Sequence, residues 1–104
     1  MSSSLENQYI NPREVYFSAY DTSFVTGDSP VVHDIKTTLS KRAIDGYINN
    51  FGSGDLSFEI SHDGTNYGQA MICPAGDTRS LKVFSTSKVR VTWIADTKYE
   101  VVAW

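Results

Sequence analysis

The sequence predicts an all-β fold: a single antiparallel β-sandwich or jelly roll of about eight short strands, preceded by an extended N-terminal arm. Two observations predict it. Residue types that favour strands (Val, Ile, Thr, Tyr, Phe and Trp) supply 38 of the 104 residues, whereas Leu and Glu occur only four times each. Turn signals recur about every 8 to 12 residues, and no long stretch between them has a helical apolar period. A small closed barrel is the alternative architecture.

We expect residues 1–13 to form the arm and residues 14–104 to form the sandwich domain. The first 13 residues are polar except for spaced apolar positions at Leu5, Tyr9 and Ile10, and Asn11-Pro12 marks a turn. Such a segment cannot build a core of its own. It either orders against a neighbouring subunit, with these three apolar residues as the partner-binding positions, or remains a disordered tail.

Four strands are expected in the first half of the chain, over residues 14–19, 22–26, 31–39 and 43–51. Within residues 31–39, Val31, Ile35 and Leu39 lie on one side of the expected strand and charged or hydroxyl residues on the other. Turn residues separate the elements, with Gly-Asp-Ser-Pro at 27–30 and Gly-Ser-Gly-Asp at 52–55.

The second half predicts strands over residues 56–61, 67–72, 78–84, 88–94 and 99–104. Leu56, Phe58 and Ile60 alternate with polar residues and should face inward. Asp-Gly at 63–64 suits a hairpin turn. We expect residues 78–84 and 88–94 to pair as a hairpin, and Trp104 to hold the end of the chain in a core or an interface.

Composition excludes several classes of protein. A net charge of −3 argues against a general nucleic-acid binder. No run of about 18 apolar residues is present to span a membrane. The N-terminus lacks the basic and apolar regions of a secretion signal. The single cysteine excludes an internal disulfide framework, which suggests synthesis in a reducing compartment.

Catalytic and metal-binding chemistry finds little support, so we expect no enzyme activity, no cofactor and no metal. His33 and His62 lie in different segments without a second His or Cys at metal-ligand spacing. Cys73 has no visible base beside it and is expected to be a small buried hydrophobe. The Asp63 turn, with Asp55 and Asp77 in other turns, could gather calcium ligands, but we favour the interpretation that these Asp and Asn side chains hydrogen-bond their own turns.

A basic segment offers a candidate docking surface. Residues 79–90 hold four cationic side chains, and no acidic residue lies between positions 77 and 96. If the expected hairpin forms, Lys82, Lys88 and Arg90 share its outer face and could orient the protein on an acidic partner surface. The alternative is a solvated sheet face on which edge lysines prevent aggregation.

Part of the sequence resembles a known class of proteins. The order Gly-Ser-Gly at 52–54, Ser-His-Asp-Gly-Thr-Asn-Tyr at 61–67, Pro-Ala-Gly-Asp-Thr at 74–78 and Val-Arg-Val at 89–91 resembles small β-sandwich virion proteins of tailed bacteriophages. The resemblance covers residues 43–104. It implies a non-enzymatic capsid decoration or cement protein, or a head–tail accessory piece in the neck, tail or fibre. Its implied partners are the major capsid protein or other virion proteins, and its implied assembly is a homo-oligomer, with a trimer as one form. It would be made in the host cytoplasm and be located in the virion.

The same hairpin also looks like that of discoidin-type sandwiches, which bind carbohydrates and cell surfaces. This resemblance implies the alternative function of a carbohydrate- or receptor-binding module. Sugar sites use exposed aromatic side chains with polar groups nearby. The candidate glycan contacts are Tyr47, Phe51, Tyr67 and Trp104.

Overall fold

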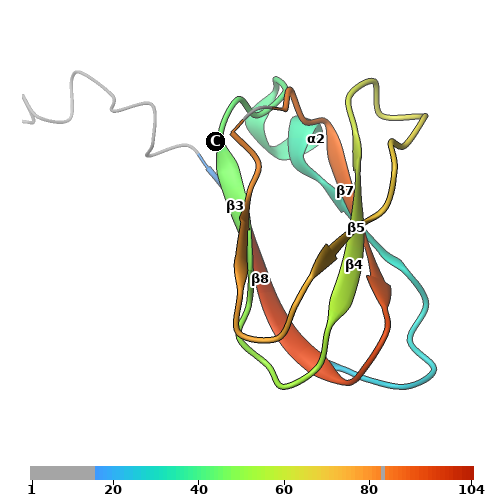
Figure 1. Ribbon diagram of the computed structural model, residues 1–104. Coiled ribbons are helices and arrows are strands. Elements are labelled where there is room, and N and C mark those ends of the chain that lie inside the picture. The colour runs from blue at the N-terminus through green and yellow to red at the C-terminus, as the bar shows by residue number, and fades with distance from the viewer. Residues whose placement is uncertain (1–15, 83) are drawn as a thin grey trace, which may run out of the picture.

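The computed structural model describes residues 16–82 and 84–104, which form two four-stranded antiparallel sheets packed face to face (Figure 1). The expected arm, including Leu5, Tyr9 and Ile10, lies outside the described residues. Sheet A has the strand order β1-β8-β3-β6 and sheet B the order β2-β7-β4-β5. This is the eight-stranded jelly-roll arrangement, so the predicted all-β sandwich is confirmed.

The element bounds follow chain order. They are β1 Phe17–Phe24, β2 Val31–Asp34, the short helix α2 Ile35–Leu39, β3 Gly46–Asn50, β4 Leu56–Ser61, β5 Met71–Cys73, β6 Thr78–Ser80, β7 Lys88–Trp93 and β8 Thr97–Ala103.

The core lies between the two sheets and is built by alternation along the strands. Leu56, Phe58 and Ile60 face inward from β4 and are at most 7% exposed, as predicted. Tyr99 and Val101 meet them from β8 and are fully buried. The period-two pattern therefore divides each strand into a core face and an outer face.

Several expected elements differ from the structure. The strand expected over 67–72 is the short β5, Met71–Cys73, and the strand expected over 78–84 ends at Ser80. The two strands expected over residues 14–26 are one strand, β1, whose pairing with β8 shifts register between Asp21 and Phe24. The strand expected over 31–39 ends at Asp34, where the helix α2 begins. Both Asp34 carboxylate oxygens accept hydrogen bonds from Thr37, one from its backbone N–H and one from its hydroxyl. Such an N-cap stabilises the first turn of a helix. Residues 35–39 are therefore helical, although their apolar residues alternate as in a strand.

The expected hairpin between residues 78–84 and 88–94 is wrong. β6 pairs with β3 in sheet A, whereas β7 lies between β2 and β4 in sheet B. The chain therefore passes from one sheet to the other between β6 and β7, and Leu81 and Thr86 of this connection are buried. Sequential strands of a jelly roll commonly belong to opposite sheets, which the turn composition of the segment does not reveal.

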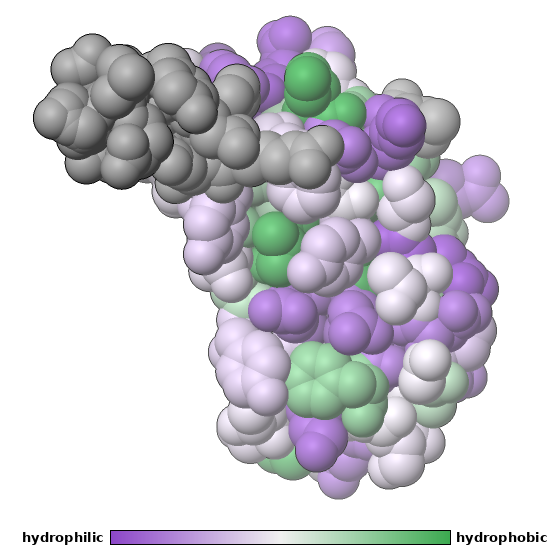
Figure 2. Space-filling view, turned by 90° about the vertical axis from the view of Figure 1, so that its left-hand side faces the viewer, coloured by the Kyte–Doolittle hydropathy of each residue, from purple (hydrophilic) through white to green (hydrophobic). Residues whose placement is uncertain are grey.

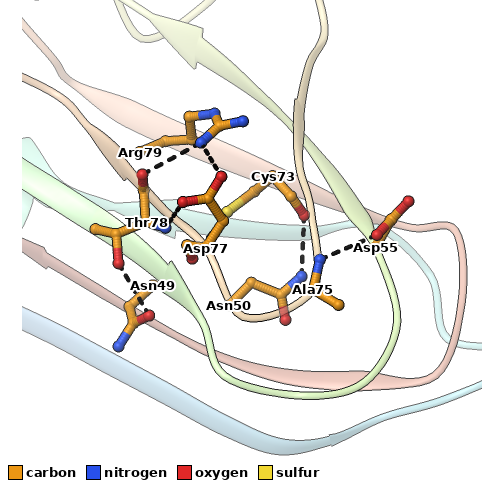
Figure 3. A network of polar contacts seen from close by, with 8 residues as sticks. All are labelled: Asn49, Asn50, Asp55, Cys73, Ala75, Asp77, Thr78 and Arg79. Atoms are coloured by element: carbon orange, nitrogen blue, oxygen red, sulfur yellow. Dashed lines mark hydrogen bonds and ion pairs between the residues drawn. The ribbon is translucent and has the colours of Figure 1, made fainter.

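A buried polar network around Asn50 ties the turn after β3 to both sheets, and Figure 3 shows its contact with Cys73. Asn50 is fully buried, and its side-chain amide donates to the carbonyls of Gly54 and Cys73, at 2.8 and 2.9 Å. Its Oδ1 accepts from the Thr97 hydroxyl at 2.6 Å and from the Gly52 N–H at 3.2 Å. Every hydrogen-bonding group of this side chain is therefore satisfied, as a buried amide requires.

Candidate functional site

The outer faces of the two sheets differ in chemistry, and sheet A carries a group of aromatic side chains. We call this surface the aromatic face and define it by Tyr20 on β1, Tyr47 on β3, Phe51 directly after β3, and Trp104 directly after β8. Figure 2 looks toward this side of the molecule and shows hydrophobic and pale side chains interleaved with strongly hydrophilic ones on a surface without a deep hollow. Tyr20 is 62% exposed, the largest value for an aromatic side chain on this face.

Strand register places these side chains in successive rows across sheet A. Tyr47 pairs with Val102, and the next outward row contains Asn49, Glu100 and Tyr20. Phe51 lies one step further, where its backbone N–H bonds to the carbonyl of Lys98. From Lys98 to Trp104 is six residues along β8, which corresponds to about 20 Å at the rise of an antiparallel strand. The aromatic face is therefore an elongated strip.

The rings form two pairs, one toward each end of the strip. Tyr20 and Phe51 stack, with ring centroids 5.3 Å apart and planes 22° from parallel. Tyr47 and Trp104 meet edge to face at 6.4 Å. Both geometries are the favoured ones for aromatic pairs, which hold the rings in defined orientations.

Polar side chains separate the two pairs. The Asn49 carbonyl oxygen accepts from the Thr78 hydroxyl at 3.1 Å, which leaves its NH2 group without a partner among the described residues (Figure 3). The Glu100 carboxylate makes no hydrogen bond or ion pair with any described residue. The Lys98 ammonium lies 5.6 Å from the centre of the Phe51 ring. The middle of the strip therefore offers one carboxylate and one amide, and the end at Phe51 adds one ammonium.

Three of the four predicted glycan contacts come together on this face: Tyr47, Phe51 and Trp104. Tyr67 does not, because it lies over the guanidinium of Arg90 on the outer side of sheet B, 4.1 Å from ring centre to Cζ. Tyr20 was not predicted. Its alternation with the inward residues of β1 was a usable signal, but only the pairing of β1 with β8 brings it beside Phe51.

The predicted basic face does not form as one surface. Lys88 and Arg90 lie on the outer side of β7, whereas Lys82 lies in the connection after β6. Arg90 donates from Nε to the Glu59 carboxylate at 2.8 Å, and this hydrogen bond lowers the pKa of Glu59 and raises that of Arg90. The charge of Arg90 is therefore already paired, and sheet B presents an ionic outer face rather than a purely cationic one.

Hydrogen bonds within the turn after β4 explain why it has the composition Asp-Gly-Thr-Asn. The Asp63 carboxylate accepts from the backbone N–H groups of Asn66 and Thr65, from the Asn66 side chain and from the Ser61 hydroxyl. These bonds, led by that from the Asn66 backbone, hold the Asp63 pKa well below its ordinary value. Over residues 16–82 and 84–104, no group of three or more His, Cys, Asp and Glu side chains is placed to hold a metal ion.

The remaining reactive groups are structural. His33 hydrogen bonds to the Tyr99 hydroxyl at 2.9 Å, and burial lowers the pKa of this imidazole. Burial also raises the pKa of the Cys73 thiol, which is the opposite of nucleophile activation. Within the described part of the chain, no helix is long and apolar enough to cross a membrane.

A cavity of about 560 Å³ opens beside the turn after β4. His62 lines it, with its Nδ1 bonded to the Ser85 carbonyl at 2.9 Å. Ser85 also lines it, and the other lining residues are Ile60, Gly68, Gln69, Ala70, Met71 and Phe84. Its only titratable lining group is His62, so it offers no pair of groups for acid–base chemistry.

Comparison with known proteins supports the fold. A scan against protein-family models finds no match, and a search of curated proteins finds none either. Among solved structures, a protein of the Bacillus endospore appendages, described as disulfide-linked pili, is similar with a TM-score of 0.57 at 14% identity. That match covers 86% of this chain and 82% of the pilus chain.

Enzymes share the same arrangement. Hydroxypropylphosphonic acid epoxidase from S. wedmorenis matches with a TM-score of 0.53 at 14% identity, over 86% of this chain. Streptomyces albus HEPD matches with a TM-score of 0.51 at 13% identity, also over 86%. This chain spans only 44% of the epoxidase and 18% of HEPD. At these identities the likeness shows a shared fold alone, and a shared fold does not determine function.

Proposed function

We propose that this chain is a non-enzymatic structural protein of a bacteriophage particle, a capsid decoration or cement protein that binds and stabilises the assembled head. The observation that carries the proposal is the eight-stranded jelly roll, an arrangement that recurs in viral capsid and lectin domains. The sequence resemblance over residues 43–104 supports it, and the aromatic face, on which Tyr20 is 62% exposed, offers a further binding surface.

The N-terminal arm is the proposed attachment to neighbouring subunits, through Leu5, Tyr9 and Ile10. The arm joins the described chain at Tyr16, at the beginning of the edge strand β1. In this proposal, particle attachment uses the arm, and the aromatic face of sheet A has a separate role in recognition. Lys82 and Lys88 remain the candidates for long-range attraction to an acidic shell, since Arg90 is paired with Glu59.

Stabilisation of a shell follows from mass action. A protein that binds the assembled head but not its free subunits shifts the assembly equilibrium by its own binding free energy. The repeated symmetric positions of a capsid favour a closed homo-oligomer of the decorating chain, for which a trimer is the proposed form.

Particle association tests this function directly. The lysate of producing cells is sedimented through a density gradient, and the chain is quantified by mass spectrometry in each fraction. We expect it to migrate with phage heads at a copy number in the hundreds. A copy number of about three to twelve, which matches a ring or vertex of low symmetry, would instead assign it to the neck, tail or fibre. Recovery only in the soluble fractions would refute the virion role.

Deleting residues 1–13 tests the arm. We expect lower particle occupancy with an unchanged far-ultraviolet circular dichroism spectrum, because all eight strands of the two sheets lie within residues 17–103. Full occupancy after the deletion would remove the arm from the attachment.

A further inference from the structure

We propose that the aromatic face binds an extended, uncharged polysaccharide, with its rings against the C–H faces of the sugars and its central polar side chains on their hydroxyls. The inference rests on the proposed function only in taking this face as the recognition surface. Its ligand and its residues are separate from particle attachment and can be tested without a particle.

The ring pairs provide the apolar contacts. Tyr20 is covered on one side by Phe51 and still has 62% of its surface exposed, so the opposite side of its ring faces solvent. Aromatic side chains expose a large rigid surface with few rotatable bonds, so holding a ligand against them costs little side-chain entropy. The apolar side of a pyranose ring is a suitable partner for such a surface.

The polar centre argues for a sugar rather than a protein partner. Protein interfaces are depleted of charged residues at their centres, but here Glu100 lies on β8 at the middle of the strip. A protein covering Glu100 would have to supply donors for a carboxylate stripped of its water. Sugar hydroxyls donate to a carboxylate and accept from an amide or ammonium, while water still reaches the site. The free acceptor sites of Glu100 and the free NH2 group of Asn49 therefore match a hydroxyl-rich ligand.

Charge and shape define the ligand further. The strip holds one cation, Lys98, and one anion, Glu100, so it has no electrostatic preference for sulfated or uronic-acid polymers. Its length of about 20 Å along β8 exceeds a single sugar ring. The absence of a deep hollow on the face in Figure 2 suits the side of a chain rather than a buried chain end.

Affinity electrophoresis gives the first test, with dextran, laminarin, galactomannan and arabinoxylan each cast into a native gel. We expect at least one of them to retard the protein, and alginate, a charged control, to retard it no more strongly. Isothermal titration with the retarding polysaccharide then gives the dissociation constant. Failure of all four uncharged polymers to retard the protein would overturn the proposal.

Three variants locate the site. Tyr20→Ala and Glu100→Ala should each raise the dissociation constant at least tenfold. Tyr67→Ala is the matched control, because it removes an aromatic ring from the outer side of sheet B and should change affinity less than twofold. Urea unfolding of each variant verifies that the domain remains folded. Equal losses in all three variants, or none in the first two, would refute this placement of the site.

Particle occupancy of the same variants separates the two proposals. We expect Tyr20→Ala to remain on the particle at full copy number while losing polysaccharide binding. If Tyr20→Ala instead leaves the particle and no polysaccharide is bound by the unaltered protein, the face docks onto a protein. That result would overturn the polysaccharide proposal and leave the virion role standing.

Discussion

Replacing Asn50 with Ala should destabilise the domain more than any single change on the aromatic face. Asn50 lies at the end of β3 and makes four hydrogen bonds from a fully buried side chain. Its partners belong to the turn after β3, to β5 in sheet B and to β8 in sheet A. Alanine would leave four polar groups without this partner and a cavity where the amide had been.

The magnitude follows from the burial of these bonds. Those to the Cys73 carbonyl and the Thr97 hydroxyl are buried, and an orphaned buried group costs about 1–3 kcal/mol. The two bonds to the turn are partly buried and contribute about 0.5–1.5 kcal/mol each. The sum is about 3–9 kcal/mol before water enters the cavity, so we expect a net loss of about 4 kcal/mol. For a domain of this size that corresponds to a fall in Tm of about 15–30 °C.

Urea unfolding, followed by circular dichroism and tryptophan fluorescence, measures this loss. The matched control is Asn49→Ala, one residue earlier, where the side chain faces outward and accepts a single exposed bond from Thr78. We expect the control to lose less than about 1 kcal/mol, as surface substitutions do. If Asn50→Ala also stays within about 1 kcal/mol of the unaltered protein, the network does not hold the two sheets together and the argument fails.

Three further predictions concern other buried or constrained positions. Burial lowers the pKa of His33 below 6.5 in the folded state, so the unfolded chain takes up the proton at a higher pH than the folded protein. The free energy of unfolding should therefore fall as pH drops below about 6.5. His33→Gln should remove this dependence in urea titrations at several pH values, and a dependence that persists would assign it to another group. Gly46→Ala, at φ +152°, adds a clash between the new Cβ and the Val102 carbonyl oxygen to the backbone strain. Gly76→Ala, at φ +75° with no atom within 4 Å, should cost only the backbone strain of about 1–2 kcal/mol. We expect Gly46→Ala to lose about 1–3 kcal/mol more than Gly76→Ala, and equal losses in thermal unfolding would contradict the close approach. The buried Cys73 thiol should react with iodoacetamide at least about tenfold more slowly in the folded protein than in denaturant; equal rates would show that the site is open.

Charge attraction to a particle needs a modified test, because the structure changes which residues can serve. Reversing Arg90 would place a second carboxylate beside Glu59 and confound docking with loss of an ion pair. Lys82→Glu together with Lys88→Glu avoids this pair. We expect the double variant to associate with particles more slowly and with a weaker dependence on salt. Association kinetics that remain unchanged at low salt would exclude these lysines from docking.

The local pattern of the sequence was sufficient for the fold class and for much of the core. Alternation in residues 56–61 correctly predicted the inward side chains of β4, because the two faces of a strand are set by neighbouring residues alone. The turn at Asp63 was also predicted from the sequence, since its carboxylate accepts hydrogen bonds from residues only two or three positions away. The helix cap at Asp34 was also local, but the apolar alternation around it favoured the wrong element.

Strand partners could not be determined in this way, and the candidate site depends on them. Tyr20 and Phe51 are 31 positions apart, and their stacking requires β1 and β3 to flank β8 in one sheet. The same is true of Asn50, which bonds to Thr97 across 47 positions. The sequence by itself determined that the chain forms an antiparallel sandwich and which side of many strands faces the core, because both depend on short-range alternation and turn chemistry. Only the tertiary structure decided which rings share the aromatic face, and that Lys82 and Arg90 do not share a basic one. The physical reason is that pairing between distant strands is selected by the packing of the whole core, and no short stretch of residues contains that information.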